Sequence, residues 1–190
     1  MRRSDYQREE NCDEYLRLLQ NSDYQEVTFD EESGGVSAVH RRHKFDKQQG
    51  AFGMRRSDYE RAVLDVLRRN GYRAVLSEET NDPGAKSCDG YLNDLPMEIK
   101  SVEGTGLWSI SKKLRYAEKQ HAQILVLYYP NEEIYNPFRV NDGLRLFLSH
   151  PDYEGILSRL LIVIKDRIEV DFNKKTTPIE GWSIQEGLRR

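Results

Sequence analysis

The sequence predicts an α/β fold in which helices flank a mixed sheet. Apolar runs typical of strands alternate with segments whose apolar residues recur at helical spacing. Residues 122–129 form a continuous apolar run, as expected for a strand that is covered on both faces. The chain has 190 residues, of which 37% are apolar, and this suits one domain or one domain with an appendage.

The first 53 residues are expected to form a small α+β extension that precedes the core. Its end, residues 48–53, is rich in Gln and Gly and is typical of a linker. The expected elements are a helix over residues 13–20 and a hairpin from residues 27–29 and 36–39. We therefore divide the chain into an N-terminal extension, residues 1–53, and a core domain, residues 54–190.

For the core domain, the sequence predicts a helix, a strand, a hairpin, a second helix and a further strand, in that order. Ser57 and Glu60 have the spacing of a capping box at the start of the first helix. The expected elements are a helix at 57–70, a strand at 72–77, a hairpin at 89–101, a helix at 108–121 and a strand at 122–129. A helix at 143–148 and a hairpin from 159–165 and 168–172 enlarge the sheet or cover its edge.

The hairpin at residues 89–101 carries the polar residues that are the best candidates for a catalytic or metal-binding site. Because the side-chain period of a strand is two, Glu98 and Lys100 project from the same face. The partner strand, joined through the turn at Asn93 and Asp94, can bring Asp89 towards that face. Two carboxylates and an ammonium at an exposed sheet edge suit a site where a divalent cation lies between the carboxylates.

This pattern resembles a known family. Asp89, followed after eight residues by Glu98-x-Lys100, is similar to the core of the PD-(D/E)xK nucleases. Residues 59–129, about a third of the chain, also resemble the C-terminal nuclease toxin domains of contact-dependent growth-inhibition proteins. Related domains occur on phage head-morphogenesis proteins. The resemblance implies a restriction-endonuclease-like fold, hydrolysis of tRNA or DNA, and an immunity protein or phage head components as partners.

The resemblance also implies roles for individual residues. Asp89 and Glu98 would hold Mg²⁺ or Mn²⁺, which oxygen-only ligation favours over Zn²⁺. Glu60, on the first core helix, matches the position of an extra metal ligand, although a capping role alone also explains it. Lys100 would position or activate water and stabilise charge on the phosphate. Contacts to the nucleic-acid backbone would come from Lys112, Lys113, Arg115 and Gln120, on the helix that follows the core strand.

A second basic cluster lies between residues 40 and 56, where the formal charge is +5. Arg41, Arg42 and Lys44 are interleaved with Phe45 and can grip phosphates. A solvated basic loop explains the same residues without any function.

Two other functions fit the sequence. In a metal-independent ribonuclease of the barnase or colicin kind, His40, His43 and Lys100 would carry the reaction and Asp89 would orient them. Residues 34–40 resemble a stretch in the phage-associated members, which keeps this alternative open. In a non-catalytic nucleic-acid-binding or phage structural module, Asp89, Glu98 and Lys100 would form ion pairs on a solvated sheet face.

The sequence also predicts the cellular location of the protein. No apolar run approaches 18 residues, and the first residues lack the apolar segment of a signal peptide. Two cysteines, Cys12 and Cys88, are too few for a disulfide framework and are expected to be free thiols. We therefore expect a cytoplasmic protein without a membrane partner.

Overall fold

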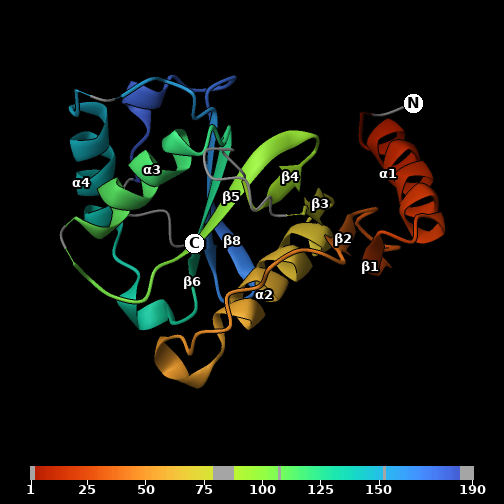
Figure 1. Cartoon of the computed structure of the whole chain (residues 1–190). Coiled ribbons are helices and arrows are strands. Elements are labelled where there is room, and N and C mark those ends of the chain that lie inside the picture. Colours follow the sequence, from red (N-terminus) through yellow and green to blue (C-terminus); the bar gives the residue numbers. More distant parts are fainter. Residues whose placement is uncertain (1–2, 79–87, 107, 152, 185–190) are drawn as a thin grey trace.

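The computed structural model describes residues 3–78, 88–106, 108–151 and 153–184. Its main feature is one mixed sheet of eight strands, which lie side by side in their sequence order (Figure 1). The strands are β1 Tyr24–Phe29, β2 Val36–His40, β3 Arg73–Leu76, β4 Gly90–Leu92, β5 Leu95–Ser101, β6 Ile124–Tyr129, β7 Arg159–Ile164 and β8 Arg167–Asn173. The α-helices are α1 Arg3–Gln20, α2 Arg56–Arg69, α3 Ser109–Lys119 and α4 Pro137–Leu148. Short 3-10 helices are η1 Ala51–Gly53, η2 Glu132–Ile134 and η3 Ile179–Gly181.

Each parallel pair of neighbouring strands is joined by a helix. α2 connects β2 to β3, α3 connects β5 to β6, and α4 connects β6 to β7. The remaining neighbours pair antiparallel. Because β2 and β5 run in the same direction, α2 and α3 both begin on the same side of the sheet, beyond the carboxyl ends of these strands. The candidate site lies there, at the carboxyl end of β5.

The helices cover both faces of the sheet and so confirm the predicted fold class. α2 packs on one face, where Val63 and Leu67 belong to a core cluster with Met97. α3 and α4 pack on the other face, where Leu114 and Phe147 belong to a second cluster. Every residue of β6 is buried, as the apolar run at residues 122–129 predicts.

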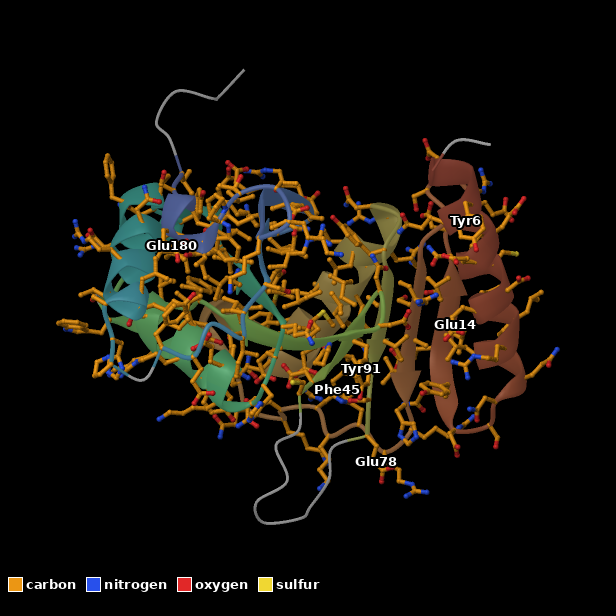
Figure 2. All side chains as sticks on the ribbon, turned by 90° about the horizontal axis from the view of Figure 1, so that it is seen from above. Tyr6, Glu14, Phe45, Glu78, Tyr91 and Glu180 are labelled. Atoms are coloured by element: carbon orange, nitrogen blue, oxygen red, sulfur yellow. The ribbon has the colours of Figure 1, made fainter. Side chains whose placement is uncertain are left out.

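α1 covers the β1–β2 end of the sheet. Leu18 forms a third core cluster with Val36, Ala38 and Val75, on the face that α2 does not cover. Figure 2 shows α1, marked by Tyr6 and Glu14, at one end of the molecule and Glu180 towards the other end. α1 already includes Arg3, well before the predicted start at residue 13. The sequence does not signal this first half of the helix, because it has few apolar residues.

A repeated hexapeptide occurs at both of the first two helices. Residues 1–6 and 54–59 are identical in sequence, and Tyr6 and Tyr59 both lie within a helix, in α1 and α2 respectively. The surroundings of the two copies differ, since Tyr6 is 59% exposed whereas Tyr59 is 2% exposed. Within the described residues the shared segment is helical in both places, and tertiary packing decides what each helix buries.

The β4–β5 hairpin confirms the predicted turn. Asn93 and Asp94 have φ values of 47° and 67°, so both central residues of the turn are left-handed. This is the arrangement of a two-residue type I′ turn, whose twist matches that of the flanking strands. Asn and Asp tolerate left-handed backbone better than most other residues, which explains their place here.

The start of α2 differs from the prediction. The helix begins at Arg56, and the Asp58 carboxylate accepts a hydrogen bond of 3.3 Å from the Arg55 amide. Ser57 therefore lies inside the helix, and the predicted capping box of Ser57 and Glu60 is wrong. The Glu60 carboxylate is instead hydrogen-bonded to His43.

α4 also begins earlier than predicted. The sequence indicates a helix from residue 143, whereas α4 starts at Pro137. The Asn136 side chain caps this start by accepting from the Arg139 amide at 3.3 Å. Proline is favoured in the first helical turn, and Pro137 occupies the first position of α4.

The predicted N-terminal extension and core domain share the one sheet. β2 pairs in parallel with β3 over four residue pairs, from Val36 with Arg73 to Val39 with Leu76. The division at residue 53 stays a prediction.

Among the described residues, no helix has both the length and the apolar character needed to cross a membrane.

Candidate functional site

A cavity of about 640 Å³ opens where α2 and α3 begin, at the carboxyl end of β5. Its walls carry five carboxyl groups and four basic side chains, so it is a strongly polar cleft. The described lining residues are Lys44, Asp46, Arg56, Tyr59, Glu60, Asp89, Glu98, Ile99, Lys100, Ser101, Glu103, Gly104, Ser109, Lys113 and Tyr116. Ligand sites in open α/β sheets commonly occupy this position, beyond the carboxyl ends of the strands.

The structure brings Asp89, Glu98 and Lys100 together in this cavity. The Lys100 ammonium pairs with Glu98 Oε1 and lies 3.9 Å from Asp89 Oδ2. The Ile99 amide donates to Asp89 Oδ2 at 2.7 Å, and the Asp89 amide donates to Glu98 Oε2 at 3.3 Å. The backbone at the start of β4 and the middle of β5 thus fixes both carboxylates beside one cation.

Glu98 is buried, which corrects the expectation of a carboxylate on an exposed or solvated sheet edge. Its residue exposure is 2%, and β5 is an interior strand that lies between β4 and β6. Burial, followed by the charge of Asp89, raises the pKa of Glu98 to about 7, although Lys100 opposes this shift. Burial lowers the pKa of Lys100, but the two carboxylates outweigh it and the net shift is upward. Lys100 is therefore an ammonium at neutral pH.

Tyr116 completes the surroundings of Lys100. Its ring, on α3, lies with its centroid 4.8 Å from Lys100 Nζ, within the range of a cation–π contact. Tyr116 is three residues after Lys113, so both side chains share one face of α3 and both line the cavity. Tyr116 was not predicted as a site residue, although its i, i+3 spacing from Lys113 places it on the same side of the helix.

Glu60 lines the cavity but is engaged by a histidine. Its Oε2 lies 2.7 Å from His43 Nε2, and His43 Nδ1 lies 2.9 Å from the Ser77 carbonyl oxygen. Because a carbonyl oxygen only accepts, Nδ1 carries a proton and donates it to Ser77. The His43 side chain is 1% exposed, so it acts as a buried brace between α2 and the end of β3.

The two histidines of the metal-independent alternative do not share the cavity with Lys100. His40 packs edge-on against Tyr24, with ring centroids 5.3 Å apart. Neither His40 nor His43 is among the described residues that line the cavity. The geometry consequently does not assemble His40, His43 and Lys100 into one acid–base site.

The metal-binding expectation can be compared with the ligands that the cavity offers. Within the part of the chain that the structure describes, no group of three or more His, Cys, Asp or Glu side chains is arranged to hold a metal ion. Mg²⁺ often takes only one or two protein carboxylates and completes its shell with waters and substrate phosphates. Asp89 and Glu98 fit that smaller set, since both already contact one cation, the Lys100 ammonium. The role of Glu60 as a further ligand stays a prediction.

The predicted nucleic-acid contacts divide into two groups. Lys44 and Lys113 line the cavity, and burial, followed by the charge of Lys100, lowers the pKa of Lys113. The others are not among the described lining residues. Lys112 is exposed on α3, Arg115 contacts His150, the Gln120 carbonyl accepts from Cys88, Arg41 donates to the Ser22 carbonyl, and Arg42 pairs with Glu78.

The cavity also contains an ion-pair cluster that the sequence analysis missed. The Arg56 guanidinium contacts Glu103 at 3.1 Å and Asp46 at 3.2 Å. Glu103 also accepts from the Ala51 amide at 3.4 Å and the Ser101 hydroxyl at 3.2 Å. These contacts join the start of α2, the loop after β5 and the segment before η1. Arg56 and Glu103 are 47 residues apart, so local sequence patterns give no sign of their pairing.

Comparison with known proteins adds one structural likeness. No protein-family model and no curated protein matches the sequence. Among solved structures, the chain is similar to a CdiA-CT/CdiI toxin and immunity complex from Burkholderia pseudomallei. The two are 15% identical, the match covers 62% of this chain and 83% of that chain, and the TM-score is 0.45. At this identity and TM-score, the likeness assigns no function to the chain.

Proposed function

We propose that this protein is a phosphodiesterase that hydrolyses nucleic acid, with Asp89, Glu98 and Lys100 at its centre. The observation that carries the proposal is that two carboxylates meet one ammonium inside an open, polar cavity. Burying like charges is costly, and an ionisable group with a strongly perturbed pKa in a cleft is typical of functional sites. Glu98 meets this description.

Asp89 and Glu98 are the residues that would hold Mg²⁺ or Mn²⁺. A bound ion of this kind polarises a phosphoryl oxygen and acidifies water. Lys100, which stays protonated, offers positive charge to a phosphate and restrains the Glu98 carboxylate through its ion pair. Its raised pKa supports an electrostatic role and not that of a base. Lys44 and Lys113 supply further positive charge for flanking phosphates.

The resemblance of residues 59–129 to growth-inhibition and phage-associated nuclease domains supports a more specific version of the proposal. In that version the substrate is tRNA or DNA, and the protein acts as a toxin with an immunity partner or as part of a phage protein. The cavity geometry supports hydrolysis of a phosphodiester equally well in either context.

One observation favours a second candidate, a non-catalytic module that binds nucleic acid. The Lys100 ammonium contacts the carboxylates of both Asp89 and Glu98, and such a cluster also fits a purely structural ion-pair network. This module would bind nucleic acid with an affinity that falls steeply with salt and would cleave nothing.

Cleavage assays distinguish these functions. The protein is incubated with plasmid DNA and with total tRNA, each in Mg²⁺, in Mn²⁺ and in EDTA. We expect cleavage only with metal, and we expect Glu98→Gln and Asp89→Asn to abolish it while circular dichroism shows a folded protein. Cleavage by Glu98→Gln at the wild-type rate would contradict the proposal. Cleavage that survives EDTA would point to a metal-independent reaction, and no cleavage by folded protein would favour the binding module.

A matched control is available in Glu118. This carboxylate is also buried, at 3% exposure, but it is on the inner side of α3 and accepts from the amides of Glu154 and Ile156. Glu118→Gln removes a buried carboxylate without touching the cavity lining. We expect this variant to lose stability but to keep metal-dependent cleavage at temperatures where it is folded.

A further inference from the structure

The outer side of α3 exposes two large aromatic rings beside two lysines. Trp108, which precedes the helix, is 55% exposed and Tyr116 is 48% exposed. Lys112 and Lys119 are exposed as well. The spacing of these residues, four, four and three, places them along one side of the helix. We call Trp108, Lys112, Tyr116 and Lys119 the α3 face.

The α3 face leads directly into the cavity. Tyr116 belongs to both, since its ring lines the cavity and lies beside the Lys100 ammonium. At the start of the helix, Ser109 lines the cavity and follows Trp108 in the chain. Anything that contacts both rings therefore passes the mouth of the site that contains Asp89 and Glu98.

The charge of the α3 face suits a polyanion. The helix has one acidic residue, Glu118, and its carboxylate is buried, where it accepts from the amides of Ile156 and Leu157. The exposed lysines of the face are therefore not offset by a carboxylate of the same helix. Lys113, on the cavity side of α3, adds a further positive charge at the cavity wall.

We propose that the substrate enters the cavity as a single strand of nucleic acid, with unpaired bases stacked on Trp108 and Tyr116 and phosphates near Lys112 and Lys119. This inference rests on the proposed function and names its substrate class. Aromatic rings that alternate with basic side chains are the usual platform for single strands, because every base offers a π-face. In a duplex these faces are already stacked and paired.

The burial of the reaction centre supports the same conclusion. Glu98 is 2% exposed, and the Asp89 side chain is 19% exposed. A phosphate must therefore enter the cleft to approach them, and a flexible single strand can do so with less distortion than a duplex. The same requirement holds for a single-stranded end or loop of a folded RNA.

The first test measures equilibrium binding in EDTA, so that cleavage does not interfere. Fluorescein-labelled single-stranded RNA and DNA, and the matching duplexes, are titrated with wild-type protein and three variants. Trp108→Ala should weaken single-strand binding by about tenfold or more, as expected for the loss of one stacked base. Trp108→Phe should bind within about threefold of wild type. Phe138→Ala, which removes a ring that is 57% exposed on α4, should bind like wild type.

The second test uses the two tryptophans of the chain. Trp182 is 3% exposed and stacks on Phe172, whereas Trp108 is exposed. Single strands should quench the tryptophan fluorescence of the wild type, and Trp108→Phe should abolish the quenching while binding persists. Duplexes should cause little quenching. Whether RNA or DNA gives the larger effect identifies the natural sugar.

The outcomes separate this inference from the proposed function. Equal affinity for duplex and single strand, together with an unchanged affinity of Trp108→Ala, would overturn the binding of single strands on the α3 face, even if metal-dependent cleavage is observed. Trp108-dependent binding of single strands without cleavage under any metal would support binding on the α3 face and overturn the proposed hydrolysis. Preferential cleavage of single strands that Trp108→Ala slows would support both.

Discussion

At the scale of single residues, the alternation in β5 predicts which side chains share a face but not how deeply they lie. Glu98 and Lys100 alternate with Met97 and Ile99, and the structure places the apolar pair in the core cluster beneath α2. The burial of Glu98 could not be predicted, because the local alternation does not show that β5 lies inside the sheet, between β4 and β6. The local pattern therefore indicated the right residues and the wrong environment.

The buried Glu98 predicts a pH-dependent stability in the metal-free protein. Its pKa is about 7 in the folded state, above its ordinary value, mainly because of burial and then because of Asp89. A raised folded-state pKa means that its stabilising contribution is complete below about pH 4.5 and is lost as pH rises through about 7. We expect the free energy of unfolding of wild type, relative to Glu98→Gln, to fall by up to about 3 kcal/mol over this range.

Urea unfolding in EDTA at pH 4.5 to 8 measures this difference. Comparison with Glu98→Gln removes the contributions of the other carboxyl groups that titrate in the same range. A difference that stays constant with pH would show that Glu98 titrates at its ordinary value and is not buried as described.

The two cysteines should differ in reactivity. Cys12 is exposed on α1, whereas burial, followed by the charges of Glu98 and Asp89, raises the pKa of Cys88 to about 12. Because the thiolate is the reactive form, Cys88 should react slowly at pH 7.5. A thiol titration of native protein should show one fast group, which Cys12→Ser removes. Two equally fast groups would contradict the described surroundings of Cys88.

At the scale of elements, strongly patterned segments were predictable and capped or polar ones were not. The β4–β5 hairpin, the continuous strand β6 and the apolar stripe of α2 all follow from local sequence. The start of α2 was mispredicted because Ser57 and Glu60 imitate a capping box, whereas His43, 17 residues earlier, holds Glu60. The first half of α1 was missed because its polar residues carry no apolar stripe.

The contact between α3 and α4 provides a test of packing. A Cβ on Gly143 would lie 2.5 Å from Ile110 Cβ and 2.6 Å from its Cγ2, so Gly143→Ala forces the two helices apart. Alanine gains about 1 kcal/mol of helix propensity, but overpacking of this kind costs about 1–3 kcal/mol or more. The Cβ of Ile110 is close to the backbone and cannot move aside as the flexible end of a long side chain can. We therefore expect the clash to dominate and the stability of Gly143→Ala to fall.

Chemical denaturation of Gly143→Ala, with Gly104→Ala as control, measures this effect. A Cβ on Gly104 meets nothing within 4 Å, so that variant should unfold like wild type. An increase in stability for Gly143→Ala would mean that α3 and α4 are further apart than described.

At the scale of the whole molecule, the cavity depends on parts that the sequence predicts separately. Lys44 and Asp46 come from the predicted N-terminal extension, whereas Lys100 and Lys113 come from the predicted core domain. The trio on one hairpin was predictable because its members are close in sequence. The Arg56–Glu103 pair and the His43–Glu60 pair were not, since their members are 47 and 17 residues apart in the chain.

Two deletions test how far the cavity needs the N-terminal residues. Deletion of residues 1–20 removes α1 and the burial of Leu18, which should cost about 2 kcal/mol or more. None of the deleted residues is among the described lining of the cavity, so metal-dependent cleavage should persist in the folded fraction. Deletion of residues 1–53 should instead abolish cleavage.

The reason lies in what the longer deletion removes. It takes away β2, the parallel partner of β3, and His43, the partner of Glu60. It also removes Lys44 and Asp46 from the cavity wall. Unfolding curves and cleavage rates of both deletions, beside the full chain, measure the effect. If residues 54–190 fold cooperatively and cleave at the full-length rate, the division at residue 53 is a domain boundary; loss of both would make the sheet from β1 to β8 the smallest folding unit.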